Sequence, residues 1–408
     1  MATTVNSASE HDAESGVARR CDDGSFGWAK PSVCGVTAES TSPVGQLNPP
    51  DDEYWMVVAG TTSDGRHRLS VHRVTALGDG FAEQEVAGLD LESAPQCLMP
   101  DRHRGVLLGR ASRNPDGHAL DSFALRSNTN GGVDLVRTHT VATFPIPVHL
   151  ARSARRPAST DSTAQIADPA QSTATDPLIA VSHFWEGQVG LHRWQVDGSL
   201  CPVGVIEGFG SSVHERQKTS HAHSSLIIGD DLYVADFGAD VVRRYRHGSL
   251  AATWVAPPGS GPRHLADVTG GVIAVNTELT NRLHLLDAHS LVEFGGADAH
   301  GWSSLPPWHV GHNQASDLTY IADGSIALVG HRGLNGLAVH QIRDGEARAT
   351  DWIPLRGAPR VIAPGPAGML AVAAEGNGWV QILRPDTSRY VEAFAFQPYA
   401  TTTSVSFW

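Results

Sequence analysis

Charged or aromatic residues recur at one fixed position in a series of similar stretches of the chain. In each stretch this residue stands five positions before the first apolar residue of a β-type run. The pairs are Phe184 and Val189, Phe237 and Val242, Glu278 and Leu283, Arg332 and Leu337, and Glu375 and Val380. Counting back 14 or 15 residues from the last four of these positions gives His223, Arg263, Asp317 and Arg360.

Together, these residue types can bind and hydrolyse an anionic ester. Arginine binds carboxylate or phosphate in a bidentate manner, and a carboxylate among arginines can act as a general base on water. The arginines lower the pKa of that carboxylate, which keeps it ionised but makes it a weaker base. Histidine adds proton transfer near neutral pH. We expect Glu278, His223, Arg263 and Arg332 to be catalytic. The residues expected to bind substrate are Arg360, Asp317, His149, His183 and Glu375.

Each of these residues also has a purely structural interpretation. Glu278 with Arg263, and Glu375 with Arg360, could be ion pairs repeated from one unit to the next. His223 could cap a strand, and Arg332 could only neutralise nearby carboxylates. Two further histidines are expected outside the site. His221 flanks His223 with its side chain directed elsewhere, and His264 alternates away from Arg263 into the packed interior.

The stretches that carry these residues are copies of one unit, which reads as strand, glycine-containing turn, strand, polar tip and strand. Seven units start near Trp55, Gln96, His149, His223, Arg263, Ser316 and Arg360. Their spacings are roughly 40 to 55 residues when the insertion that splits the third unit is left out. Such a period indicates a solenoid, propeller or array, and alternating β-branched runs exclude helical repeats. We predict an all-β, seven-bladed β-propeller with four-stranded blades. A β-sandwich array is the alternative.

The propeller geometry predicts where the candidate residues meet. Adjacent antiparallel strands place the start of one strand and the end of the next on the same rim. The innermost strands of all blades start around one central channel, so the candidate residues are expected at one mouth of that channel. The final stretch, TTTSVSFW, reads as a strand that completes the first blade and closes the ring, which removes an exposed sheet edge.

Two segments lack the repeat. Residues 1–50 are rich in Ser, Thr, Ala, Asp and Glu and are predicted to be a disordered tail. Residues 152–177 interrupt the third unit and are predicted to be a flexible insertion in a hairpin loop. The propeller domain is therefore expected to span residues 51–408.

Composition excludes several classes of protein. The 408 residues carry a formal net charge of −13, so a nucleic-acid binder that neutralises phosphates is not expected. The chain has 30 basic residues but only two lysines, Lys30 and Lys218, which argues against P-loop or Schiff-base chemistry. There is no run of 18 apolar residues and no signal-peptide pattern at the N-terminus. The four cysteines show no CxxC spacing. The expected location is the cytoplasm, as a monomer or weak homo-oligomer without a membrane partner.

Other catalytic chemistry has little support. No GxSxG elbow and no GxGxxG following a strand are present. His221 and His223 form an HxH pair, whose alternation on a strand leaves a zinc site geometrically open, but no third ligand is evident. We expect no metal and no cofactor.

Four stretches of the sequence are similar to the seven-bladed β-propeller lactonase family, which includes cycloisomerase-type 6-phosphogluconolactonases and carboxy-muconate lactonising enzymes. They are SHAHSSLIIGDDLYVADFGADVVRRY, GSGPRHLADVTGGVIAVNTELTNRL, NQASDLTYIADGSIALVGHRGLNGLAVHQI and RGAPRVIAPGPAGMLAVAAEGNGWVQI. With weaker matches the resemblance covers about Trp55 to Pro385. It implies an active site at the channel mouth, with the family's histidine on His223, its arginines on Arg263 and Arg332, and its glutamate on Glu278.

The resemblance implies a lactonase that hydrolyses a cyclic ester of an anionic sugar acid, similar to 6-phosphogluconolactonase and part of carbohydrate metabolism. In the expected mechanism Glu278 activates water, an arginine stabilises the oxyanion and His223 protonates the leaving alkoxide. The chain departs from the family pattern beside these residues, at Thr277, at Gly330–His331 and at Val181–His183. A muconate-type lactonising cyclase, a pseudoenzyme and a non-enzymatic binding platform are the alternatives.

Overall fold

The computed structural model describes residues 53–408, apart from 78–79, 115–116, 130–131, 144, 154–175, 299–312, 323–324 and 388. The predicted tail and most of the predicted insertion lie outside the described residues. Within them the chain forms 28 strands, grouped into seven antiparallel sheets of four strands each. This confirms the predicted fold. No helix of the described part is long and apolar enough to cross a membrane.

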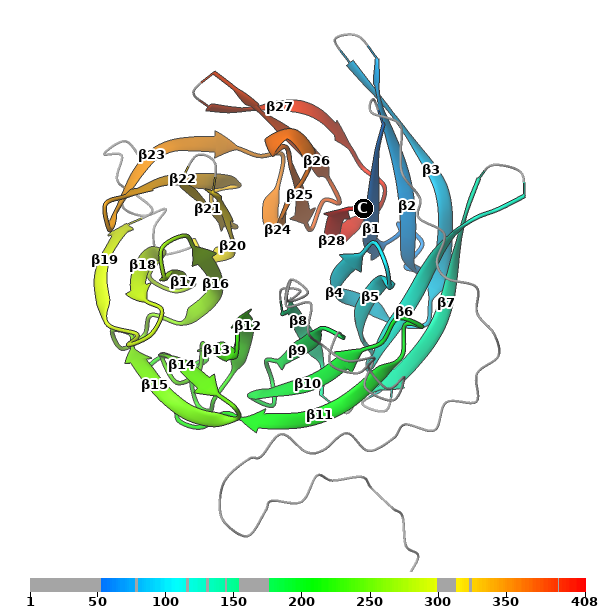
Figure 1. Ribbon diagram of the computed structural model, residues 1–408. Coiled ribbons are helices and arrows are strands. Elements are labelled where there is room, and N and C mark those ends of the chain that lie inside the picture. The colour runs from blue at the N-terminus through cyan, green and yellow to red at the C-terminus, as the bar shows by residue number, and fades with distance from the viewer. Residues whose placement is uncertain are drawn as a thin grey trace, which may run out of the picture.

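The sheets are arranged in a ring around a central channel, and each sheet forms one blade (Figure 1). Blade 1 consists of β28 (Thr401–Phe407), β1 (Glu53–Thr61), β2 (His67–Leu77) and β3 (Gly80–Leu91). Blade 2 consists of β4 (Ala94–Asp101), β5 (Gly105–Ala111), β6 (Ala119–Ser127) and β7 (Val133–Ala142). Blade 3 consists of β8 (Pro147–Arg152), β9 (Leu178–His183), β10 (Gln188–Trp194) and β11 (Leu200–Glu207).

The remaining blades follow in chain order, and the first strand named in each is the innermost. Blade 4 consists of β12 (Ala222–Ile228), β13 (Asp231–Asp236), β14 (Val241–Arg246) and β15 (Ser249–Val255). Blade 5 consists of β16 (Pro262–Val268), β17 (Val272–Thr277), β18 (Arg282–Asp287) and β19 (Glu293–Asp298). Blade 6 consists of β20 (Ala315–Ile321), β21 (Ile326–His331), β22 (Gly336–Arg343) and β23 (Glu346–Pro354). Blade 7 consists of β24 (Ala358–Pro364), β25 (Leu370–Glu375), β26 (Val380–Asp386) and β27 (Arg389–Phe396).

The last strand closes the ring as predicted. β28 pairs with β1 in antiparallel register, with Val57 opposite Ser406 and Val58 opposite Val405. The C-terminal strand thus lies inside the blue N-terminal strands in Figure 1. The C-terminus thus supplies the innermost strand of blade 1, and the N-terminal strand β1 is paired on both sides.

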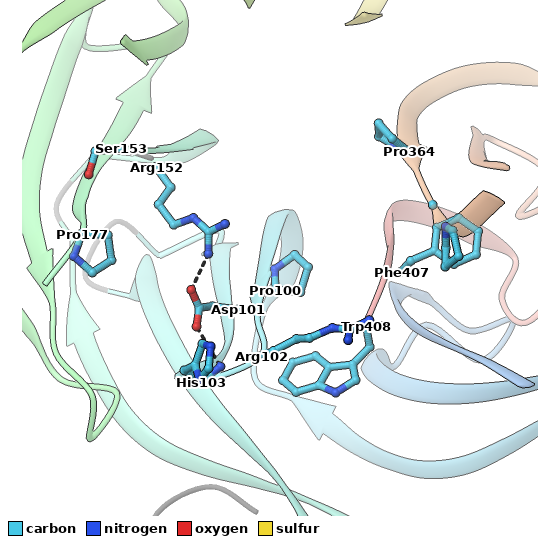
Figure 2. Close-up of a pocket in the computed structure, with 12 residues that line it drawn as sticks. Pro100, Asp101, Arg102, His103, Arg152, Ser153, Pro177, Pro364, Phe407 and Trp408 are labelled. Carbon is cyan, nitrogen blue, oxygen red and sulfur yellow. Dashed lines mark hydrogen bonds and ion pairs between the residues drawn. The ribbon is translucent and has the colours of Figure 1, made fainter. Parts of the chain in front are cut away.

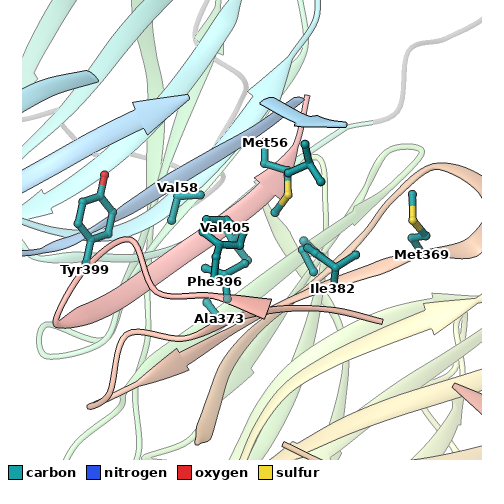
Figure 3. Close-up of a cluster of buried hydrophobic side chains, with 12 residues drawn as sticks. Met56, Val58, Met369, Ala373, Ile382, Phe396, Tyr399 and Val405 are labelled. Carbon is teal, nitrogen blue, oxygen red and sulfur yellow. The ribbon is translucent and has the colours of Figure 1, made fainter. Parts of the chain in front are cut away.

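Apolar side chains alternate along the strands and pack between neighbouring blades. The cluster between blades 7 and 1 contains Met56, Val58, Ala373 and Val405, each at most 2% exposed (Figure 3). Similar clusters join other pairs of neighbouring blades. Such burial contributes roughly 1.5–3 kcal/mol for each large aliphatic side chain, so the ring is a rigid frame for residues at its rims.

Every innermost strand carries a β-bulge near its first residue. In β12 the ladder passes from Ala222 to Ser224, and in β16 it passes from Pro262 to His264. The residues left out of the ladders in this way are Thr403, Gln96, Val148, His223, Arg263 and Arg360, and in β20 the irregularity falls between Ala315 and Leu318. A bulge frees a side chain from the strict alternation of the strand and redirects it. The bulges therefore position residues at one mouth of the channel.

Candidate active site

Glu278 lies in the turn that follows β17 at this mouth. Its backbone N–H donates to Gly261 O at 2.8 Å, and its carbonyl accepts from Ala315 N at 3.1 Å. The turn is completed by Asn281, which has a positive φ of 56°, a conformation that asparagine tolerates better than most residues. The carboxylate is fully buried. Backbone contacts to the residue before β16 and to the first residue of β20 thus fix it in place.

Three arginines from three different elements surround this carboxylate. Arg263, from the bulge in β16, forms an ion pair with Glu278 Oε2. Arg216, from the loop between β11 and β12, donates from Nη1 to Glu278 Oε1 at 2.7 Å. Arg332, from the turn after β21, places Nη2 3.2 Å from the same oxygen. One buried negative charge therefore faces three positive charges, which leaves the cluster with a net positive charge.

The turns that carry Glu278 and Arg332 are tied together by Asn313. Its side-chain amide donates to Asn281 Oδ1 at 2.8 Å and lies 2.7 Å from His331 Nδ1. Its own side-chain oxygen accepts from Gly333 N at 3.1 Å. His331, one of the departures from the family pattern, thus takes part in holding the two turns at a fixed spacing.

Arg216 did not emerge from the sequence, because it lies in a loop outside the repeated unit. The loop is nevertheless well anchored, since the buried side chain of Gln217 donates to Phe237 O and to Asp240 Oδ1, each at 2.7 Å. The guanidinium of Arg216 lies 4.6 Å from the centre of the Phe237 ring. The only sequence signal is the charged run His214–Lys218, directly before the SHAHS stretch.

The arginines determine the ionisation of the cluster. Burial alone would raise the pKa of Glu278, but the charges of Arg263, Arg332 and Arg216 outweigh it and lower the pKa to about 2. Burial lowers the pKa of Arg263 to about 10, against the opposing effect of Glu278. Both groups are therefore charged at neutral pH.

His223 lies beside the cluster in the bulge of β12. Burial, followed by the charges of Arg263 and neighbouring groups, lowers its pKa well below the usual 6.5. Its Nδ1 atom is buried without a hydrogen-bond partner among the described residues. His223 is thus a neutral imidazole with an unused ring nitrogen.

Two more imidazoles lie near His223. The ring of His264 lies 5.3 Å from that of His223 and 5.2 Å from that of His149, centre to centre. His264 Nδ1 donates to Asp317 Oδ1 at 2.6 Å. His264 was expected in the packed interior, and its side chain is 14% exposed and packs against His223 and His149. Asp317 contacts His264 and the backbone of Ile362 rather than the arginines.

In the described structure, the other expected site residues form no hydrogen bond or ion pair with the side chains of this cluster. Arg360 and Glu375 form their own ion pair at 2.5 Å on the rim of blade 7. His183 is 5% exposed at the end of β9, and burial lowers its pKa to about 4. The structure brings together Glu278, Arg263 and Arg332, with His223 alongside, and adds Arg216.

Elsewhere, three residues have the geometry of a hydrolytic triad. Ser70 Oγ lies 2.6 Å from His72 Nε2, and His72 Nδ1 lies 2.5 Å from Glu83 Oε1. However, Ser70 is fully buried, and its hydroxyl also bonds to Tyr399. A substrate cannot reach it, so this network bonds the closing segment to blade 1 rather than catalysing hydrolysis.

A cavity of about 650 Å³ opens at the opposite mouth of the channel (Figure 2). It is lined by the ends of inner strands and by the loops that follow them, including Pro100, Pro364 and Trp408. Asp101 bonds to Arg152 and to the backbone of His103. None of the expected site residues lines this cavity. In the described part of the chain, no three His, Cys, Asp or Glu side chains are grouped so that they could hold a metal ion.

The fold and the cluster define a seven-bladed β-propeller with a buried, positively charged Arg/Glu/His site at one channel mouth. The family model described as "Lactonase, 7-bladed beta-propeller" matches residues 149–390. The chain therefore belongs to the seven-bladed β-propeller lactonase family.

The chain is also similar to two sequence relatives and to several solved structures. Two uncharacterised Lactococcus lactis proteins are each 28% identical over 173 residues, which is 40% of this chain and 50% of each relative. A proposed 6-phosphogluconolactonase from Bacteroides fragilis is similar with a TM-score of 0.68 and 21% identity, covering 88% of this chain and 100% of that one. The periplasmic gluconolactonase of Pseudomonas aeruginosa has a TM-score of 0.68 and 20% identity, covering 87% and 99%. At these identities the structural likeness shows the fold alone.

Proposed function

We propose that this protein is a lactonase that hydrolyses an anionic cyclic ester, with a phosphorylated sugar lactone as the first substrate to test. One observation carries the proposal. Arg332 Nε and His223 Nδ1 are buried beside the cluster and have no hydrogen-bond partner among the described residues. Buried polar atoms without partners are costly, and an anionic ligand would supply an acceptor for Arg332 Nε. Family membership and the names of the Bacteroides and Pseudomonas neighbours support this reaction class.

Binding of an anion would also adjust the reacting groups. The charges of Arg263, Arg332 and Arg216 lower the pKa of Glu278, while burial, followed by the charge of Arg263 and neighbouring groups, lowers the pKa of His223. A phosphate or carboxylate held by these arginines cancels part of that charge, so the pKa values of both groups rise when substrate binds. The site would therefore become more basic only when the correct ligand is present.

We assign the proton transfer to His223 rather than to Glu278. Both oxygens of Glu278 already face arginines, and with a pKa of about 2 it is a weak base. In the proposed reaction, water attacks the lactone carbonyl while His223 accepts its proton. The ring C–O bond then breaks, and the imidazolium returns the proton to the leaving alkoxide. Arg263 and Arg332 stabilise the oxyanion, and Glu278 holds the arginines in place.

The proposal is tested by pH-stat hydrolysis of 6-phosphoglucono-δ-lactone, glucono-δ-lactone and a muconolactone, with and without EDTA. We expect metal-independent hydrolysis, fastest for the anionic lactone. Glu278→Gln should lower kcat/KM roughly 100-fold, in the range found for loss of one preorganised electrostatic group.

Glu392→Gln is the matched control, because it removes a carboxylate of the outermost strand of blade 7, β27, that pairs with Arg356 and not with any residue of the cluster. It should retain full activity. No acceleration above the spontaneous rate on any of these lactones would contradict the proposal and favour a binding platform.

A further inference from the structure

A continuous wall of aromatic rings runs from the catalytic histidine to the outer rim of the mouth. The Phe184 ring lies 5.4 Å from His223, 5.6 Å from Phe237 and 4.5 Å from His221, with which it is stacked. Trp185 meets Phe184 edge-on at 5.0 Å and His221 at 6.2 Å. Arg216 covers Phe237 at the other end of this wall.

Exposure rises along the wall toward the solvent. Phe237 is fully buried and Phe184 is 8% exposed, whereas Trp185 is 63% exposed. Core packing therefore accounts for the inner rings, but it leaves one face of the largest ring without a partner. A single exposed apolar residue is ordinary on a protein surface. Trp185 differs because its ring continues a buried cluster that contacts the proposed proton carrier.

The wall is held rigidly. His221 Nδ1 donates to Phe184 O at 2.8 Å, and Gly187 N donates to the same carbonyl at 3.3 Å. Gly208 N then donates to Gly187 O at 2.8 Å, which connects the turn to the loop of Arg216. Because these bonds fix the His221 ring and the backbone of the turn that carries Phe184 and Trp185, a ligand would lose little free energy in ordering this turn.

The wall offers few hydrogen bonds to a ligand. The ring nitrogen Nδ1 of His221 is already bonded to Phe184 O. The nearby carboxylate of Asp236 accepts from Ser220, from His221 N and from Arg243. A substituent lying here would therefore gain more from apolar stacking than from hydroxyl groups.

We propose that the preferred substrate is an anionic ester that carries a second, apolar ring, which stacks on Trp185 while Arg216 and its neighbours hold the anion. The ester part of this inference rests on the proposed function. The stacking part concerns binding alone, so it is tested without turnover.

The test compares phenyl phosphate with inorganic phosphate by isothermal titration calorimetry. Trp185→Ala should weaken phenyl phosphate about tenfold, which corresponds to about 1.4 kcal/mol, and leave inorganic phosphate unchanged. Trp185→Phe should restore most of the affinity, whereas Arg216→Ala should weaken both ligands. Leu250→Ala is the matched control, since it truncates an apolar side chain that is 49% exposed on the outer strand β15.

Equal affinities of wild type for the two ligands, or equal losses for both in Trp185→Ala, would overturn the inference. Stacking in a protein that hydrolyses none of the lactones would contradict the proposed function and leave the stacking site established. Hydrolysis of a lactone without selective binding of phenyl phosphate would support the proposed function and overturn the stacking site.

Discussion

The residues of the cluster are individually ordinary but unusual as a set, because a fully buried carboxylate faces three guanidinium groups. Because its pKa is about 2, Glu278 stays ionised at neutral pH and holds the three arginines by its negative charge. The excess positive charge then acts on His223, which has no carboxylate bonded to it in the described structure. In the proposed mechanism, proton transfer by this histidine should thus depend on the charge of the ligand.

This dependence predicts a pH profile. The active forms are neutral His223 and ionised Glu278, and both take up protons only below pH 6.5 because their pKa values are lowered. For the anionic lactone, kcat/KM should be flat from pH 6.5 to 9 and fall in acid. The acid limb of kcat should lie at higher pH, because bound anion raises the pKa of His223.

The profile is measured in a pH-stat after subtraction of spontaneous hydrolysis. Uncharged glucono-δ-lactone serves as the control, and its two limbs should coincide. If the acid limbs of kcat and kcat/KM coincide for the anionic lactone as well, the charge of the bound ligand does not change the pKa of His223.

Sequence reasoning reached some of these residues and missed others for physical reasons. The repeat register placed Arg263, Glu278 and Arg332 on one rim, and these three do meet. Arg216 could not be placed, because the conformation of its loop depends on tertiary bonds from Gln217 rather than on any periodic pattern. The contacts of His264 with His149 and His223 could not be foreseen, because strict strand alternation fails at a bulge.

At the level of strands, the pattern of apolar runs and glycine turns was sufficient to predict the units and the closing role of β28. Side-chain bonds that hold this closure were not predictable, because they join residues far apart in the sequence. Tyr399, just before β28, bonds to Ser70 in β2, which in turn contacts His72. These groups are nearly or fully buried, so their bonds are expected to contribute to stability.

Tyr399→Phe should therefore destabilise the protein by about 1–3 kcal/mol, because it leaves the buried Ser70–His72 network with one partner fewer. The measurement is the midpoint of guanidinium unfolding. Tyr320→Phe is the control, since its hydroxyl makes only an exposed contact with Thr269 at 3.5 Å. Equal midpoints for the two variants would show that the network does not hold the ring closed.

For the whole molecule, buried histidines predict sensitivity to acid. Burial lowers the pKa of His183 and of His340 to about 4. The unfolded chain takes up protons at these residues below pH 6.5, while the folded protein does not until about pH 4. Their contribution to stability is thus complete above pH 6.5 and is lost as the pH falls from 6.5 to 4.

We expect the Tm to fall by about 5 °C or more between pH 7 and pH 5, measured by scanning calorimetry. His340→Leu should reduce this fall, because both ring nitrogens of His340 are buried without hydrogen-bond partners in the described part of the structure. His103→Gln, at an exposed position, is the control. An unchanged pH dependence in His340→Leu would assign the acid sensitivity to other groups.

The bulge at the start of each innermost strand also affects how this architecture can diversify. A bulged residue lies outside the hydrogen-bond ladder, so exchanging its side chain breaks no pair in the sheet. Blades 4, 5 and 7 present His223, Arg263 and Arg360 at this position, while blades 1, 2 and 3 present Thr403, Gln96 and Val148. Single substitutions at these bulged positions can therefore change which ligand the channel mouth binds, while the strand pairing of the propeller stays the same.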